Sequence, residues 1–171
     1  MGNDKRPHNS PSETAAVIGP TTRGKFNAKY PGGITRQAAD DTDTDNVHSI
    51  IQCALWCKGY YAETGSITGY YKGQSADSVE ELKADMGIGG NSTVTMEIME
   101  ALLSMKQFVL LSGYGGTEAI RGIQQTINKD YKNYTGIIPC DGLYGRDEYR
   151  YNPGASGRGR ICPGSLKRQF R

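Results

Sequence analysis

Apolar residues recur at steps of three and four positions in several segments of the chain, a spacing typical of short amphipathic helices. The clearest segment runs from Val47 to Gly59, and similar patterns occur near residues 76–86 and 95–106 and again after Thr117. In the first segment the residues that share one face are Val47, Ile50, Ile51, Ala54 and Leu55. These patterns predict an all-α fold built from short helices and long loops.

Residues suited to capping precede most of these segments, because side-chain oxygens there can accept a hydrogen bond from the first helical turn. A brief earlier helix is expected to carry Phe26 and Tyr30, four positions apart. Two glycine-rich strings, at 87–90 and 113–116, are expected to form turns. In chain order, the expected caps are Thr21 or Thr22, Asp45 or Asn46, Ser75, Thr93 or Thr95, and Thr117.

The sequence also indicates an internal repeat. The pair Ile51-Gln52 lies in the first strong helix as Ile123-Gln124 lies in the later one, and TGSITGYY parallels PCDGLYG downstream of each. The segment IGPTTRGKF is similar to the closing loop and third helix of a preceding unit. The predicted divisions are a disordered leader (1–14), the end of one repeat (15–36), an acidic solvated linker (37–46), a complete three-helix repeat (47–112), the first half of another repeat (113–148) and a basic tail (149–171).

The tail breaks the pattern that the later repeat begins. It holds six Lys or Arg residues and no Asp or Glu, and Pro153 and Pro163 interrupt it, so no amphipathic helix can be written there. Two interpretations stay open: a natural basic tail, or translation out of frame from near Glu148. The abrupt change of charge and periodicity favours the second, which reading the gene in its other two frames would test.

Composition limits the function classes. The chain has 171 residues, with 23 Gly, 7 Pro and 36% hydrophobic residues, which favours small cores separated by loops. Its net charge of +2 comes from the basic tail, so the rest of the chain offers no general nucleic-acid surface. No stretch is apolar enough to cross a membrane, and the start of the chain lacks the apolar core of a signal peptide. The chain as written is therefore expected in the cytoplasm.

The segment VHSIIQCALWCKGYYAETGSITGYYKGQSADSVEELKADMGI resembles a bacterial peptidoglycan-binding-like repeat. The resemblance rests on the loops ITGYYKG and CDGLYGR and on IGPTT, and it covers about residues 15–148. It implies small three-helix bundles in tandem, of the kind found before a glycoside-hydrolase-like domain in wall-associated proteins. The first loop has Thr68 where the family usually has Asp, whereas Asp141 retains that residue.

The resemblance implies a non-catalytic, monomeric module that binds peptidoglycan or a related wall glycan, with an extracellular or wall location for the parent protein. The hydrolase-like domain is missing, so no enzymatic activity is expected. Two alternatives stay open. One is a nucleic-acid-associated protein that acts through the Arg-rich tail. The other is a non-functional remnant, because incomplete units of this size are marginal folds.

Tyrosine is the aromatic residue that the chain uses most, with 11 Tyr against 3 Phe and 1 Trp. Flat rings with polar edges suit sugars, which present an apolar face surrounded by hydroxyl groups. One tyrosine of each pair could instead close the end of its bundle, and Trp56, which points away from its own core, could pack on a neighbouring repeat. The predicted ligand-binding residues are Trp56, Tyr60, Tyr61, Tyr70, Tyr71, Asp141 and Tyr144.

No catalytic, metal or cofactor site is predicted. Cys53 and Cys57 are four apart on one helix but lack partner ligands, so buried free thiols are the favoured interpretation. A bridge from Cys57 to Cys140 is an alternative for an exported parent, and the state of Cys162 stays open. His8 and His48 are expected to be solvated. The carboxylates at 40–45 and 80–81 are assigned to a linker and a helix surface rather than to an acid–base pair.

Overall fold

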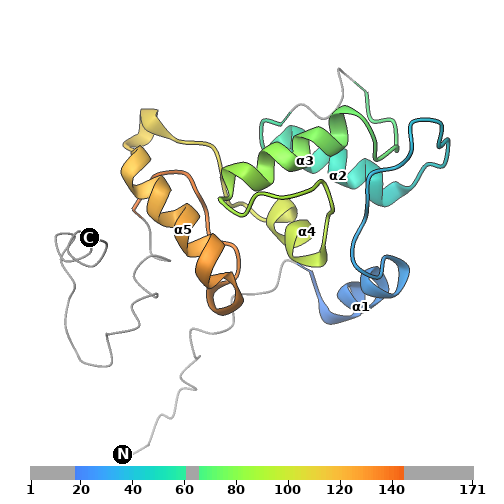
Figure 1. Cartoon of the computed structure of the whole chain (residues 1–171), viewed down its shortest axis with the longest axis horizontal. Helices are drawn as coiled ribbons and strands as arrows, with labels where there is room; N and C mark the ends of the chain where they lie inside the picture. The colour runs from blue at the N-terminus through green and yellow to red at the C-terminus, as the bar shows by residue number, and fades with distance from the viewer. Residues whose placement is uncertain (1–17, 61–65, 145–171) are drawn as a thin grey trace, which may run out of the picture.

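The computed structural model describes residues 18–60 and 66–144, and within these ranges its regular elements are helices joined by loops (Figure 1). The helices are α1 (Pro20–Lys29), α2 (Asn46–Cys57), α3 (Gln74–Asp85), α4 (Met96–Leu103), the short 3-10 helix η1 (Ser112–Tyr114) and α5 (Glu118–Thr135). The described residues form no strand; Ile34 and Val94 make an isolated antiparallel bridge. The all-α prediction is confirmed. The predicted leader and basic tail lie outside the described residues.

Three of the expected caps form as predicted. The side chain of Asp45 accepts a hydrogen bond from the Val47 N–H, Thr95 accepts one from Ile98, and Thr117 accepts one from Ile120. Each bond satisfies an amide that the first turn of a helix leaves without a partner. The polar residues before α2, α4 and α5 therefore mark the starts of these helices.

The other two cap predictions are wrong. Helix α3 begins after Gly73, whose φ of 52° suits glycine, and Ser75 lies buried inside the first turn. Its hydroxyl accepts a hydrogen bond from the Gln52 side-chain amide. Helix α1 begins at Pro20 after Gly19, which has no side chain to serve as a cap, and the fixed φ of proline suits the first helical position.

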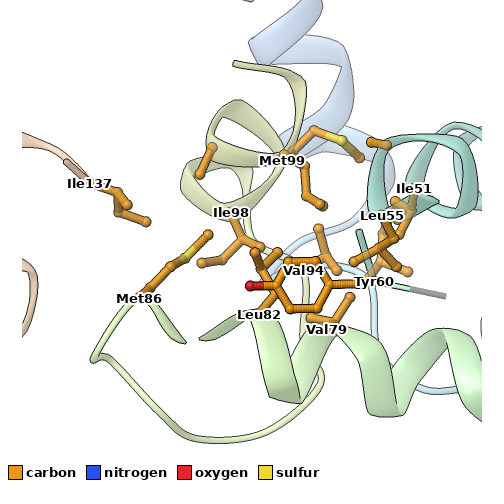
Figure 2. Packing of buried hydrophobic residues seen from close by; sticks show 14 of the residues in the cluster. Ile51, Leu55, Tyr60, Val79, Leu82, Met86, Val94, Ile98, Met99 and Ile137 are labelled. Atoms are coloured by element: carbon orange, nitrogen blue, oxygen red, sulfur yellow. The ribbon is translucent and has the colours of Figure 1, made fainter. Parts of the chain in front are cut away.

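The apolar faces of the helices meet in one core. Helix α2 contacts α3 and α4, and α1 contacts α4 from the other side. Figure 2 shows the ring of Tyr60 among the aliphatic side chains of Val79, Leu82 and Val94. Among the described residues, the apolar ones with no measurable exposure are Ile51, Leu55, Tyr71, Ala76, Val79, Leu82, Met86, Val94 and Cys140. None of the described helices is both long and apolar enough to span a membrane.

Segment 37–45 is tied to the rest of the molecule at several points, although it was expected to be a solvated linker. The Gln37 N–H donates to the Tyr71 carbonyl (2.8 Å), and the Lys72 ammonium donates to the carbonyls of Ala39 (2.9 Å) and Asp41. At its end Asp45 accepts hydrogen bonds from Lys29 and from the Tyr30 hydroxyl, at the end of α1. Residues 38–40 and 42–44 of the segment are exposed, as expected of a solvated segment, and its main-chain carbonyls supply contacts that the acidic composition did not indicate.

Helix α5 joins the molecule through the end of α3 (Figure 1). The Arg121 guanidinium donates to the Asp85 carboxylate (2.6 Å), Gln125 to the Asp85 carbonyl (3.0 Å) and Asn128 to the Met86 carbonyl (3.0 Å). The Gln125 and Asn128 amides satisfy carbonyls that the end of a helix leaves unpaired. A Cβ on Gly87 would lie 2.5 Å from the Gln125 Cβ, so this close approach requires glycine.

Candidate functional site

Two loops carry most of the predicted ligand-binding residues, and each is attached to a helix by one buried glutamine. In the first loop (residues 67–71) the Gln52 side-chain oxygen accepts from the N–H groups of Thr68 and Gly69, both at 3.0 Å. Its amide nitrogen donates to the Thr68 hydroxyl (2.8 Å), the Tyr70 carbonyl (3.1 Å) and the Ser75 hydroxyl (2.9 Å). Gln52 is 1% exposed, so these bonds form away from water.

The second loop (residues 140–144) is attached to α5 in the same way. The Gln124 side-chain oxygen accepts from the Gly142 N–H (2.9 Å), and its amide nitrogen donates to the Leu143 carbonyl (2.8 Å) and the Asp141 carboxylate (3.3 Å). Gln124 is also 1% exposed. Asp141 additionally accepts from the Leu143 N–H (2.9 Å), so this predicted ligand-binding residue already supports the loop.

The glycine of each loop is bonded to the start of a helix. The Asp45 N–H donates to the Gly69 carbonyl (3.1 Å), and the Thr117 N–H donates to the Gly142 carbonyl (2.9 Å). Both glycines have positive φ, 75° and 76°, which other residues rarely adopt. In both cases the residue bonded to the glycine caps the helix that carries the glutamine. The two loops thus share one set of contacts, which matches the sequence correspondence between them.

Two of the predicted ligand-binding tyrosines belong to the core. Tyr60 is 3% exposed and its hydroxyl donates to Asp85 (2.6 Å), while Tyr71 has no exposed surface and donates to the Ser92 carbonyl. Burial raises the pKa of both phenols, since the charged form would be desolvated. Their assignment to an exposed ligand surface is therefore wrong: the apolar part of each ring packs inside while the hydroxyl finds an internal acceptor. Tyr61 lies outside the described residues.

Three other predicted rings reach solvent. Trp56 on α2 is 49% exposed and Tyr144 is 37% exposed, whereas Tyr70 is half-buried. The Lys72 ammonium lies 4.8 Å from the centre of the Tyr70 ring, a cation–π distance. Tyr114, which the sequence argument did not select, is 81% exposed and lies in η1 just before α5.

The exposure of the α2 thiols and of His48 differs from the sequence predictions. Cys53 and Cys57 are exposed on α2, while Cys140 is buried and unbridged, so the predictions of buried thiols on α2 and of a Cys57–Cys140 bridge are wrong. Both cysteines of α2 lie on its outer side with Trp56, and burial raises the pKa of the Cys140 thiol to about 12. His48 is buried, with Nδ1 3.2 Å from the Gly69 carbonyl, because it faces the first loop rather than the acidic segment.

The glutamines are the functional candidates that residue-type reasoning missed. Both follow an isoleucine in the pairs that mark the repeat, but an isolated glutamine carries no catalytic or metal-binding signal. Their recurrence at similar distances from the two loop glycines, 17 residues before Gly69 and 18 before Gly142, was the available signal. Among residues 18–60 and 66–144, no cluster of three or more His, Cys, Asp or Glu residues is placed to hold a metal ion.

Comparison with known proteins gives two relatives. The chain is 42% identical over 137 residues to the uncharacterized protein YbfG of Bacillus subtilis (strain 168), covering 80% of this chain and 17% of that protein. It is 36% identical over 139 residues to the uncharacterized protein FadG of the same organism, covering 80% of this chain and 23% of that protein. The chain therefore spans about a fifth of the length of these relatives. No family model and no solved structure matches it.

Proposed function

We propose that the chain is a non-catalytic module that binds peptidoglycan or a related wall glycan through exposed aromatic rings. In this proposal α2, α3 and α4 form one three-helix repeat, and α5 with the second loop begins another. The shared contacts of Gln52 and Gln124 support the repeat. The module would act as a monomer, and its longer parent protein would function in the cell wall.

The observation that carries the ligand proposal is the placement of Trp56 and Tyr70 on well-fixed backbone. Trp56 is 49% exposed on a helix, and Tyr70 is half-buried in a loop whose amides and carbonyls are bonded to Gln52. Rings on rigid supports lose little conformational entropy on binding, which favours stacking against a sugar. The Lys72 ammonium beside Tyr70 adds a donor for glycan hydroxyl or carboxylate groups.

Sedimentation of the full chain with purified peptidoglycan tests this proposal. Trp56→Ala and Tyr70→Ala should each reduce the bound fraction severalfold at an unchanged melting temperature. Met105→Ala is the matched control, because Met105 is 93% exposed and apolar but not aromatic. Loss of thermal stability with intact binding would instead assign Trp56 to packing, and absence of sedimentation by the unmodified chain would refute the proposal.

A further inference from the structure

The outer side of α2 carries two thiols close to each other. Cys53 and Cys57 are both free and exposed. They are four positions apart on one helix, so they lie on the same side of it, with Cβ atoms about 5–6 Å apart. The buried face of the helix is formed by other residues, among them Ile51, Ala54 and Leu55. The two sulfur atoms therefore face solvent as a pair.

The repeat itself does not require this pair. Counted from the matched glutamines of the two helices, the places of Cys53 and Cys57 are taken by Gln125 and Lys129 in α5. The second repeat thus forms its first helix with an amide and an ammonium group where the first repeat has two thiols. The shared contacts of the two repeats therefore do not explain why cysteine stands at both places in α2.

The separation of the two thiols suits an atom held between them better than a bond between them. A disulfide needs Cβ atoms about 3.5–4.5 Å apart, which is less than the spacing that a helix sets, so closing one would distort α2. Two thiolate–metal bonds of about 2.3 Å each reach across about 4.6 Å between sulfur atoms, a separation that side-chain rotation provides. The pair is therefore arranged as a two-sulfur ligand for a thiophilic cation.

A fixed positive charge lies beside the pair. Lys58 is 7% exposed, and its ammonium donates to the carbonyls of Ser104 (2.9 Å) and Lys106 (2.6 Å). Burial lowers the pKa of Lys58, and the charge of a Cys57 thiolate opposes that shift, so the two groups are within electrostatic reach. Two thiolates around a monovalent cation carry one net negative charge, which the charge of Lys58 balances.

We propose that Cys53 and Cys57 bind one soft monovalent cation of the Cu(I) class. Thiolate ligands select such ions, and Cu(I) accepts coordination by two sulfur atoms alone. A structural Zn²⁺ needs four ligands, and in the described part of the chain no third His, Cys, Asp or Glu joins the pair to hold a metal. On binding, each thiol loses its proton to water and forms one S–Cu bond, and no electron is transferred.

Anaerobic titration with Cu(I), supplied as its bicinchoninate complex, tests the proposal on the full chain. The chain should take one Cu(I) per molecule from the chelator, and the emission of Trp56, the only tryptophan, should be quenched in step. Cys53→Ser and Cys57→Ser should each weaken binding by about 100-fold, because the second sulfur binds intramolecularly. Both residues are exposed, so the melting temperature should not change.

Further variants separate the pair from thiol content. Cys53→Gln with Cys57→Lys, which copies α5, should abolish binding and keep α2 folded. Cys57→Ser with Met105→Cys keeps two exposed thiols but moves one of them off α2, and it should bind as weakly as Cys57→Ser alone. Cys162→Ser should bind like the unmodified chain. Wall sedimentation of Cys53→Ser without copper should also equal that of the unmodified chain, so this proposal and the glycan proposal fail separately.

Three results would overturn the proposal. One is a chain that takes no Cu(I) from the chelator, or takes as much in both serine variants as in the unmodified chain. Another is displacement of the copper by an equal concentration of Zn²⁺. The third is a Cys53–Cys57 disulfide, detected by mass spectrometry after mild oxidation, that forms while α2 keeps its helicity. That outcome would show that the spacing suits a bond between the sulfur atoms.

Discussion

At the scale of single residues, the two buried glutamines explain how the loops keep their shape. A loop presents N–H and C=O groups together, and a primary amide has both two donors and an acceptor oxygen with which to bond them. Gln52 uses both functions on Thr68, Gly69 and Tyr70. A carboxylate could supply only the acceptor, and a lysine only the donor, so residue identity is strongly constrained here.

Replacing Gln52 by leucine should lower the free energy of unfolding by about 2–4 kcal/mol, because each unpaired buried polar group costs about 1–3 kcal/mol. Gln52→Glu should cost less at neutral pH if its oxygens keep the Thr68 and Gly69 amides. Urea unfolding measures both, with Gln74→Leu on the exposed start of α3 as control. A Gln52→Leu effect no larger than that of the control would contradict the role given to Gln52.

At the scale of helices, Asp45 connects two elements. It caps α2 through the Val47 N–H and also accepts from Lys29 and the Tyr30 hydroxyl (2.6 Å) at the end of α1. Burial alone would raise the pKa of Asp45, but these three donors outweigh it and hold the pKa well below its usual range. The charged carboxylate is therefore bound more favourably in the folded chain than in the unfolded chain.

This shift predicts an acid-dependent loss of stability. A lowered folded-state pKa contributes stability above the unfolded value, 3.8, and the contribution disappears as the pH falls through the folded value. Asp45→Asn should keep the helix cap but remove this part of the pH dependence. Melting temperatures from pH 7 to pH 2 check the prediction, with Asp43→Asn on the same segment as control. Parallel curves for Asp45→Asn and the unmodified chain would contradict it.

The positions of the helices were more predictable from the sequence than the residues that cap them or the burial of the tyrosine rings. The apolar spacing located α2 to α5, because burying one face dominates the energetics of a short helix. Ser75 was misassigned because its hydroxyl serves Gln52, a partner 23 residues away that local capping rules do not consider. Tyr71 was misassigned for the same reason: its acceptor, the Ser92 carbonyl, comes from a distant turn.

At the scale of the whole molecule, the junction between α3 and α5 connects the two proposed repeats. Asn128 has no exposed surface and donates to the carbonyls of Met86 and Ile138, both at 3.0 Å, while it accepts from the Ile138 N–H (2.7 Å). One side chain therefore fixes α5 to the end of α3 and to the segment that follows α5. The sequence marked the repeat but gave no indication of this contact, because an asparagine within a helix carries no packing signal.

Asn128→Leu should uncouple α5 from the rest of the fold. The substitution leaves three main-chain groups without this partner, so the unfolding free energy should fall by about 2–4 kcal/mol. Amide hydrogen exchange should show the loss of protection in α5 first, while α2 keeps its protection. Thr126→Ala, on the exposed side of the same helix, is the control. Uniform loss of protection across all helices would show that the molecule unfolds as one unit.

The exposed thiols of α2 allow the orientation of this helix to be measured. Cys53 and Cys57 lie four positions apart, about 6 Å along the axis, and both face outward, whereas Cys140 is enclosed. A fluorescent reporter bonded to both sulfur atoms could not rotate independently of the helix. The fluorescence polarization of such a reporter would therefore follow the rotation of α2. It would show whether binding of a glycan reorients this helix.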